Sequence, residues 1–361
     1  MSLHPLEAWL RLTLTPGVGP ASQRQLLAAF GLPESIYEAG FAALAGVVGA
    51  PQARLLLEHD ARPGMDAALA WLAEAGNTIL TLGDPAYPAA LLEIPDPPVL
   101  LYVKGDPALL GRPAIAVVGA RSATPQGEAN AEAFATALSA AGVTIVSGLA
   151  LGIDAAAHRG GLSGSGRTVA VIGTGADRIY PARNGDLARR IAVEGVIVSE
   201  LPLGSGPLAH HFPRRNRLIA GLARGVLVVE AAVKSGSLIT ARLAADCGRE
   251  VFAVPGSIHS PVARGCHRLI RDGAKLVESA NDILEELRWE PPKGAPVQVL
   301  SPGGEGGESG AVLEALGHDP ADLEALVHRT SLTTEALYAI LLLLELDGRV
   351  ARLPGGRFQR L

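Results

Sequence analysis

Short apolar runs alternate with amphipathic stretches between residues 111 and 290. Each of the first six runs is rich in Val and Ile and is followed by Gly, Ser or Pro, which is typical of buried strands. Strands that alternate with helices predict an α/β fold, in which helices cover both faces of a mostly parallel sheet. The expected strands are Ala114–Ala120, Val143–Leu149, Thr168–Gly173, Val196–Leu201, Gly225–Ala231, Val251–Val254 and Lys275–Val277.

Helical periodicity dominates residues 1–60 and predicts a small helical domain. The turn at Pro16–Pro20 resembles that of a helix-hairpin-helix module, whose glycine amides can face a DNA phosphate. Few basic residues flank this turn, so packing is the favoured interpretation and phosphate binding is the alternative. Residues 61–110, which are rich in Pro and Asp, are expected to form a connecting segment.

The C-terminal part begins with residues 291–310, whose Pro and Gly content predicts a flexible linker. Three helices and then a hairpin are expected over residues 311–361, an order that resembles a winged helix. The helix expected over Thr333–Leu346 would be its recognition helix, yet it contains no Arg or Lys. We therefore expect this domain to contact protein or to pack, with weak DNA binding at most.

Composition and charge narrow the function. The chain has 361 residues and no apolar run approaching the ~18 residues of a membrane span, so no membrane association is expected. Cys247 and Cys266 lack metal-like spacing and suggest a reducing, cytoplasmic environment. The net charge of −5 is uneven, because residues 1–110 carry −6, residues 111–290 carry +4 and residues 291–361 carry −3. An anionic ligand would bind the positive middle segment.

The loops after the strands are the candidate binding site, since ligands of parallel sheets bind at the carboxyl ends of strands. The turn Lys234–Ser237 leads into a helix, and a helix start offers unpaired N–H groups and partial positive charge to a phosphate. The basic cluster Arg214–Arg217 precedes a helical segment expected at Leu218–Ala223. The predicted phosphate-binding residues are Gly119, Arg121, Ser147, Gly148, Arg215, Asn216, Arg217, Lys234, Ser235, Gly236 and Ser237.

Several motifs resemble those of the DprA/Smf family of DNA-processing proteins over most of residues 85–275. The segments that carry this resemblance are Val118–Arg121, Ser147–His158, Tyr180-Pro181, Phe212–Gly221, Ser235–Ala241 and Val251–Gly256. The resemblance implies a Rossmann-like domain that binds single-stranded DNA, forms homodimers and helps to load a RecA-type recombinase during transformation. It also implies a SAM-like N-terminal domain and, in some members, a winged-helix-like C-terminal domain. Ala120 and His267 depart from the family pattern, which usually has Ser and Asn there.

Two functions from different classes remain open. The first is a non-catalytic protein without cofactor or metal, which binds single-stranded DNA through its phosphates and stacks a base on Phe212. The alternative is a nucleotide-processing enzyme, because similar sheets include phosphoribohydrolases; Glu230 is the nearest substitute for their catalytic glutamate. Asp154 and His158 could act as an acid–base pair or as metal ligands, but we favour structural roles for both.

Overall fold

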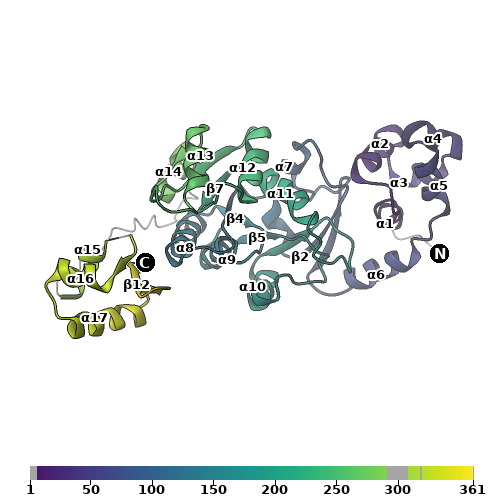
Figure 1. Ribbon diagram of the computed structural model, residues 1–361. Coiled ribbons are helices and arrows are strands. Elements are labelled where there is room, and N and C mark those ends of the chain that lie inside the picture. The colour runs from purple at the N-terminus through teal and green to yellow at the C-terminus, as the bar shows by residue number, and fades with distance from the viewer. Residues whose placement is uncertain (1–5, 291–307, 318, 361) are drawn as a thin grey trace.

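The computed structural model describes residues 6–290, 308–317 and 319–360. A central α/β domain lies between an N-terminal group of helices and a smaller C-terminal domain (Figure 1). The predicted linker over residues 291–310 falls mostly on 291–307, outside the described residues. Within the described ranges, no helix has the length and apolar character needed to cross a membrane.

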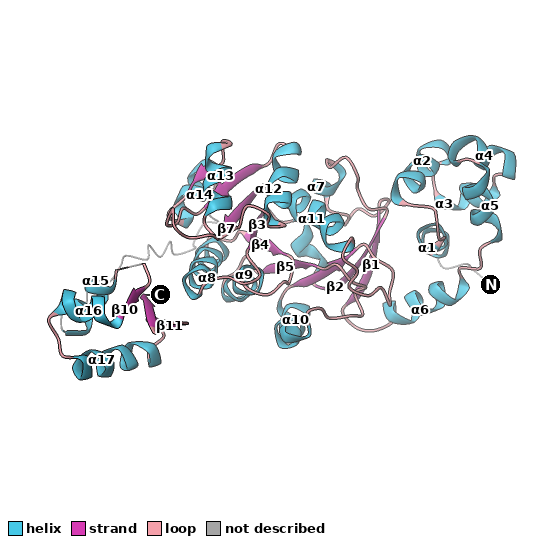
Figure 2. Cartoon of the chain, viewed as in Figure 1, coloured by secondary structure: helices cyan, strands magenta, loops and turns pink. Residues whose placement is uncertain are grey.

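A nine-stranded sheet forms the central domain, in the order β1-β2-β6-β5-β4-β3-β7-β8-β9. Figure 2 shows this sheet with helices on either side. Its strands are β1 (Asn77–Thr81), β2 (Leu100–Gly105), β3 (Ala114–Gly119), β4 (Thr144–Ser147), β5 (Thr168–Val171), β6 (Val196–Ser199), β7 (Gly225–Val229), β8 (Glu250–Ala253) and β9 (Lys275–Leu276). Strands β3 to β9 are mutually parallel, whereas β2 pairs antiparallel with both β6 and β1. The predicted mostly parallel sheet is therefore confirmed.

Helices cover both faces of this sheet, which explains why its central strands are apolar on both sides. On β3, Ile115 and Val117 pack against one layer of helices, and Ala116 and Val118 pack against the other. The first layer comprises α8 (Pro125–Ala140), α9 (Ile153–Ser163), α10 (Gly185–Glu194) and α14 (Ala280–Glu286). The second comprises α7 (Ala89–Leu92), α11 (His211–Leu222), α12 (Ser237–Asp246) and α13 (Arg264–Arg271). Two short 3-10 helices, η1 (Pro107–Gly111) and η2 (Ala182–Asn184), complete the domain.

The N-terminal region is helical, as predicted. Its helices are α1 (Glu7–Leu14), α2 (Pro20–Phe30), α3 (Pro33–Glu38), α4 (Phe41–Val48), α5 (Ala50–Glu58) and α6 (Arg62–Leu72). Their apolar side chains form one core with alternate residues of β2, where Trp71 meets Tyr102 edge-on at a ring-centroid separation of 5.7 Å. The other residues of β2, Leu101 and Val103, belong to the core of the central domain.

Residues 61–110 were expected to form a connection, but they contribute both antiparallel strands of the sheet. The run Val99–Val103 is apolar at every position because its two faces are buried against two different cores. Leu and Tyr occupy the middle of this run and Asp-Pro-Pro precedes it, unlike the Val- and Ile-rich runs of the parallel strands, and its partner β6 lies far away in the chain. Local pattern alone did not identify this strand.

The C-terminal domain contains the three predicted helices, α15 (Glu308–Leu316), α16 (Leu323–Thr330) and α17 (Thr334–Leu346). The predicted hairpin is also present, as β11 (Val350–Leu353) and β12 (Arg357–Arg360). A two-residue strand that was not expected, β10 (Ala321–Asp322), pairs with β12 and completes a small sheet. This domain has a core of its own.

Candidate functional site

The chain reverses its direction across the sheet at β3. Strands β4, β5 and β6 follow on one side of β3, whereas β7, β8 and β9 follow on the other. The loops after β3 and β7 therefore diverge and leave a crevice at the carboxyl ends of the strands. A cavity of about 620 Å³ opens there. It is lined by seven of the eleven predicted residues: Gly119, Arg121, Arg215, Asn216, Ser235, Gly236 and Ser237.

Helix α11 begins at His211, seven residues before the helical segment that was expected. Pro213 fits within this helix because proline is tolerated in the first turn, where its missing N–H needs no partner. The basic cluster therefore lies within a helix instead of a loop. Phe212, Arg215 and Asn216 consequently share one face of α11 and line the cavity.

Arg215 forms the floor of the cavity. Its side chain is buried, and Nη1 donates hydrogen bonds to the carbonyl of Gly148 (2.6 Å) and to that of Val171. Burial lowers the pKa of the guanidinium to about 10, and neighbouring Asp154 opposes that shift. Arg215 is therefore charged at neutral pH and joins the ends of β4 and β5.

Arg121 is the exposed cation of the site. Its guanidinium carbon lies 5.4 Å from the ring centroid of Phe212, whose ring is 5.7 Å from that of Tyr180. Within the described part of the chain, Arg121 has no salt-bridge partner. Tyr180 is 44% exposed. Its position in the loop after β5, at the carboxyl end of a strand, indicates that it faces the site, although it was not among the predicted ligand residues.

Helix α12 begins at the opposite wall, as predicted. The hydroxyls of Ser235 and Ser237 are 2.7 Å apart, and the backbone N–H of Ser237 donates to Ser235 Oγ at 3.3 Å. The N–H groups of Leu238 and Ile239 bond to preceding carbonyls. An anion at this wall would thus meet two hydroxyls and the positive end of α12, with fewer free N–H groups than expected.

Four predicted residues lie elsewhere. Ser147 is fully buried and donates to the carbonyl of Val117 at 2.6 Å. Gly148 lines a small adjoining cavity of about 70 Å³. Lys234 is exposed but lines a separate cavity of about 800 Å³ between α12 and α13. Arg217 projects from the opposite face of α11 and is paired with Glu200 and Asp96.

Asp154 and His158 form separate hydrogen bonds with backbone and hydroxyl groups instead of pairing with each other. Asp154 Oδ2 accepts from the N–H groups of Gly148 and Ala150, and burial raises the pKa of this carboxyl. His158 is fully buried and contacts Leu149 and Thr168, not Asp154. Among the described residues, no three His, Cys, Asp or Glu side chains gather as metal ligands would.

Glu230, the residue on which the enzymatic alternative depends, binds Thr124, the N-cap residue of α8. Its carboxylate accepts from the backbone N–H of Thr124 at 2.9 Å and from the hydroxyl of Thr124 at 2.5 Å. The side chain of Thr124 in turn accepts from the N–H of Gly127. Glu230 lines a different cavity, beside Val254 and Pro255. His267, one of the departures from the family pattern, contacts the carbonyl of Gly256 at 2.9 Å.

Comparison with known proteins identifies the family. The family profile described as DNA recombination-mediator protein A matches residues 78–288, and that of the DprA winged helix domain matches residues 298–356. The chain belongs to the DprA/Smf family. The resemblance deduced from the motifs is confirmed, and so is the winged-helix fold of the C-terminal domain.

Relatives support this assignment along most of the chain. Protein Smf of Escherichia coli K12 is 40% identical over 309 residues, which cover 82% of this chain and 80% of the relative. Protein Smf of Synechocystis is 37% identical and covers 98% of both chains. The crystal structure of DNA processing protein A from Streptococcus pneumoniae matches with a TM-score of 0.69 and 40% identity, over 79% of this chain and 99% of that one. DNA processing protein A from Helicobacter pylori, a structure that concerns its single-stranded DNA binding mode, matches with a TM-score of 0.54 and 32% identity. This match covers 58% of this chain and 96% of that one.

Proposed function

We propose that this protein binds single-stranded DNA in the cavity between the ends of β3 and β7. The observation that carries this proposal is the exposed guanidinium of Arg121, which lacks a salt-bridge partner among the described residues and lies beside Phe212. A cation of this kind attracts a phosphate, and Ser235 and Ser237 at the start of α12 offer it further donors. The single-stranded DNA binding of the Helicobacter pylori relative supports the same ligand class.

The aromatic wall of the cavity favours a single strand over a duplex. Phe212 and Tyr180 offer ring faces on which an unpaired base can stack, whereas the bases of a duplex are already stacked on each other. Aromatic residues make up only 4% of the chain, so stacking contributes at few positions. Binding is then mostly electrostatic, steeply dependent on salt and tolerant of base sequence.

We also propose that the bound strand is passed to a RecA-type recombinase in the cytoplasm, and that the protein acts as a homodimer. The family description as a recombination mediator supports the recombinase step. Co-precipitation with a RecA-type recombinase in the presence of oligo-dT tests this step, and light scattering after gel filtration tests the dimer. A monomeric protein that leaves the recombinase unbound would contradict both.

Fluorescence anisotropy with labelled oligo-dT and a matched duplex, across a salt series, tests DNA binding. We expect tighter binding to the single strand. Arg121→Ala should weaken binding of the single strand by about tenfold. It should also make the negative slope of log binding constant against log salt concentration shallower by about 0.7, the contribution of one single-strand phosphate contact. Arg62→Ala, which removes an 86% exposed guanidinium from the N-terminal domain, is the matched control and should leave both quantities unchanged.

Wild-type protein that failed to bind oligo-dT at low salt would contradict the proposal. The enzymatic alternative would then be tested by the release of free base from a panel of nucleotides. Loss of that release in Glu230→Gln would support catalysis. The contacts between Glu230 and Thr124 lead us to expect no release.

A further inference from the structure

Helix α11 presents two opposite faces to two different parts of the molecule. Phe212, Arg215 and Asn216 line the cavity. Arg214, Arg217 and Gly221 are spaced by three and four residues, so they share the opposite face. Any shift or rotation of α11 would therefore move the cavity-lining side chains together.

A buried carboxylate holds this second face. Glu200 directly follows β6, and its side chain is only 4% exposed. Its Oε2 pairs with Nη2 of Arg217 at 2.5 Å and with Nη2 of Arg214 at 3.1 Å. A buried charge is costly unless it is paired, so two guanidiniums one turn apart fix α11 against the end of β6.

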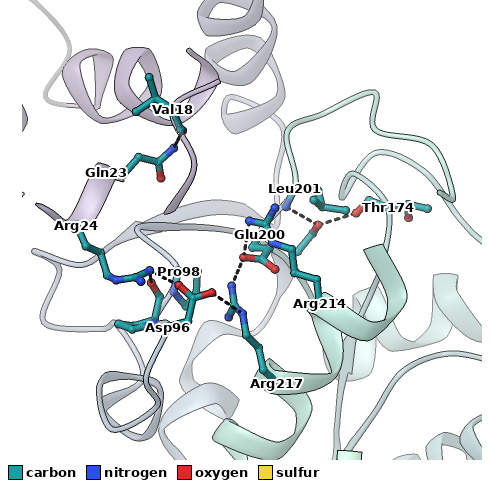
Figure 3. Close-up of polar contacts among 12 residues, drawn as sticks. Val18, Gln23, Arg24, Asp96, Pro98, Thr174, Glu200, Leu201, Arg214 and Arg217 are labelled. Carbon is teal, nitrogen blue, oxygen red and sulfur yellow. Dashed lines mark hydrogen bonds and ion pairs between the residues drawn. The ribbon is translucent and has the colours of Figure 1, made fainter. Parts of the chain in front are cut away.

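The same network continues into the N-terminal domain (Figure 3). Arg217 Nε lies 3.2 Å from Asp96 Oδ2, and Asp96 also pairs with Arg24 of α2. Arg24 further donates to the carbonyl of Pro97 at 3.1 Å. We call Arg24, Asp96, Arg217, Glu200 and Arg214 the α11 anchor, since it connects the N-terminal helices to the cavity-forming helix.

Packing supports the anchor from both sides. A Cβ added at Gly221 would lie 2.6 Å from Ile94 Cγ2, so α11 sits directly against the segment that carries Asp96. The loops after β5 and β6 also reach the N-terminal domain, because Ala176 and Leu203 pack in its core. The N-terminal core therefore contacts two loops beside the cavity, and it reaches α11 through Asp96.

We propose that the α11 anchor sets the position of the cavity-lining face of α11, so that the N-terminal domain controls DNA affinity through Asp96 and Glu200. This inference rests on the proposed function. Glu200 and Asp96 are positioning residues that act through Arg214 and Arg217 and bind no phosphate themselves. The N-terminal domain then has a role in DNA binding without contributing to the cavity surface.

The sign of the effect of removing a negative charge tests this proposal. Glu200→Gln and Asp96→Asn each remove a negative charge from the protein, which on electrostatic grounds alone tightens DNA binding. The anchor predicts the opposite, with binding of oligo-dT about tenfold weaker for Glu200→Gln and about threefold weaker for Asp96→Asn. The salt slope should stay unchanged in Asp96→Asn, because no phosphate contact is lost. Glu200→Asp, which keeps the charge, should restore part of the affinity.

The matched control is Asp186→Asn, which removes a 95% exposed carboxylate of the central domain and should not weaken binding. Hydrogen exchange without DNA gives a second measurement, in which the amides of His211–Leu222 should exchange faster in Asp96→Asn than in the wild type. Asp96 is 41% exposed, so this variant is expected to fold even if Glu200→Gln does not. Unchanged or tighter binding, or unchanged exchange in α11, would overturn the anchor. Failure of the wild type to bind oligo-dT would instead overturn the proposed function.

Discussion

His158 is buried without charge in the middle of the central domain. Its Nε2 accepts from the N–H of Leu149 at 3.2 Å, so the proton resides on Nδ1, which lies 2.7 Å from Thr168 Oγ1. The hydroxyl of Thr168 donates onward to the carbonyl of Ile145. Burial, together with the smaller effect of the charge of Arg215, lowers the pKa of His158 to about 3.

This arrangement predicts that the protein loses stability in mild acid. The folded pKa of about 3 lies below the ordinary value of 6.5, so the unfolded chain takes up the proton first. The stabilisation is complete above about pH 6.5 and falls as the pH decreases toward 3, by up to about 1.4 kcal/mol per pH unit. Urea unfolding at several values between pH 7.5 and 5 measures this change in the free energy of unfolding. His158→Gln should flatten this slope, whereas exposed His259→Gln should keep it. A wild-type stability that does not change between pH 6.5 and 5 would contradict the prediction.

Helix α17 occupies the position of a recognition helix in the winged-helix fold, but it contains no Arg or Lys. In winged-helix proteins this helix enters the major groove and contacts phosphates and bases through polar and basic side chains. Here its inner face buries Leu337, Leu341 and Leu344. Its outer side exposes large apolar side chains, namely Tyr338 (45%), Leu342 (57%), Leu343 (59%) and Leu346 (76%). An apolar surface of this kind suits protein contact better than a phosphate backbone.

We therefore predict that the C-terminal domain adds little to DNA affinity. A chain that ends at Glu290 should bind oligo-dT and duplex within about twofold of the full chain at physiological salt, because few phosphate contacts are removed. Anisotropy with both probes measures this, and far-UV circular dichroism checks that the shortened chain is folded. A loss of duplex affinity of about tenfold would show that the domain binds DNA after all.

The N-terminal helices and the central sheet share apolar surface over β2. Tyr102 is almost fully buried in the N-terminal core, while its neighbours Leu101 and Val103 belong to the core beneath the sheet. The C-terminal domain has a separate core. At the scale of the whole molecule, the first two parts are expected to unfold together.

Tyr102→Ala should consequently destabilise both parts at once. Truncating a buried aromatic side chain costs about 3–5 kcal/mol, and here the cavity would open at the boundary of the two cores. In a Trp289→Phe background, where only Trp9 and Trp71 of the N-terminal part fluoresce, urea unfolding followed by tryptophan fluorescence should coincide with unfolding of the whole chain followed by circular dichroism. Leu346→Ala, which truncates a 76% exposed side chain of α17, is the control and should cost less than about 0.5 kcal/mol. Separate transitions for the N-terminal helices and the sheet would contradict the shared core.

The sequence by itself determined the features that depend on neighbouring residues. Short Val- and Ile-rich runs, each followed by Gly, Ser or Pro, identified the parallel strands, and the turn after Gly225–Val229 located the start of α12. Because parallel strands end at one edge of the sheet, the sequence also predicted that Arg121 and Ser235–Ser237 meet at one crevice, and they line the same cavity.

Only the tertiary structure decided which members of a cluster face the ligand. Arg215 and Arg217 are two residues apart, which on a helix turns their side chains about 200° from each other. One is therefore the floor of the cavity, and the other is paired with Glu200. Ser147 does not line the cavity, because its hydroxyl donates to the carbonyl of Val117 on the neighbouring strand. Lys234 lines the separate cavity between α12 and α13. These side-chain orientations depend on contacts with residues that lie far away in the chain, so the local sequence pattern around each residue does not predict them.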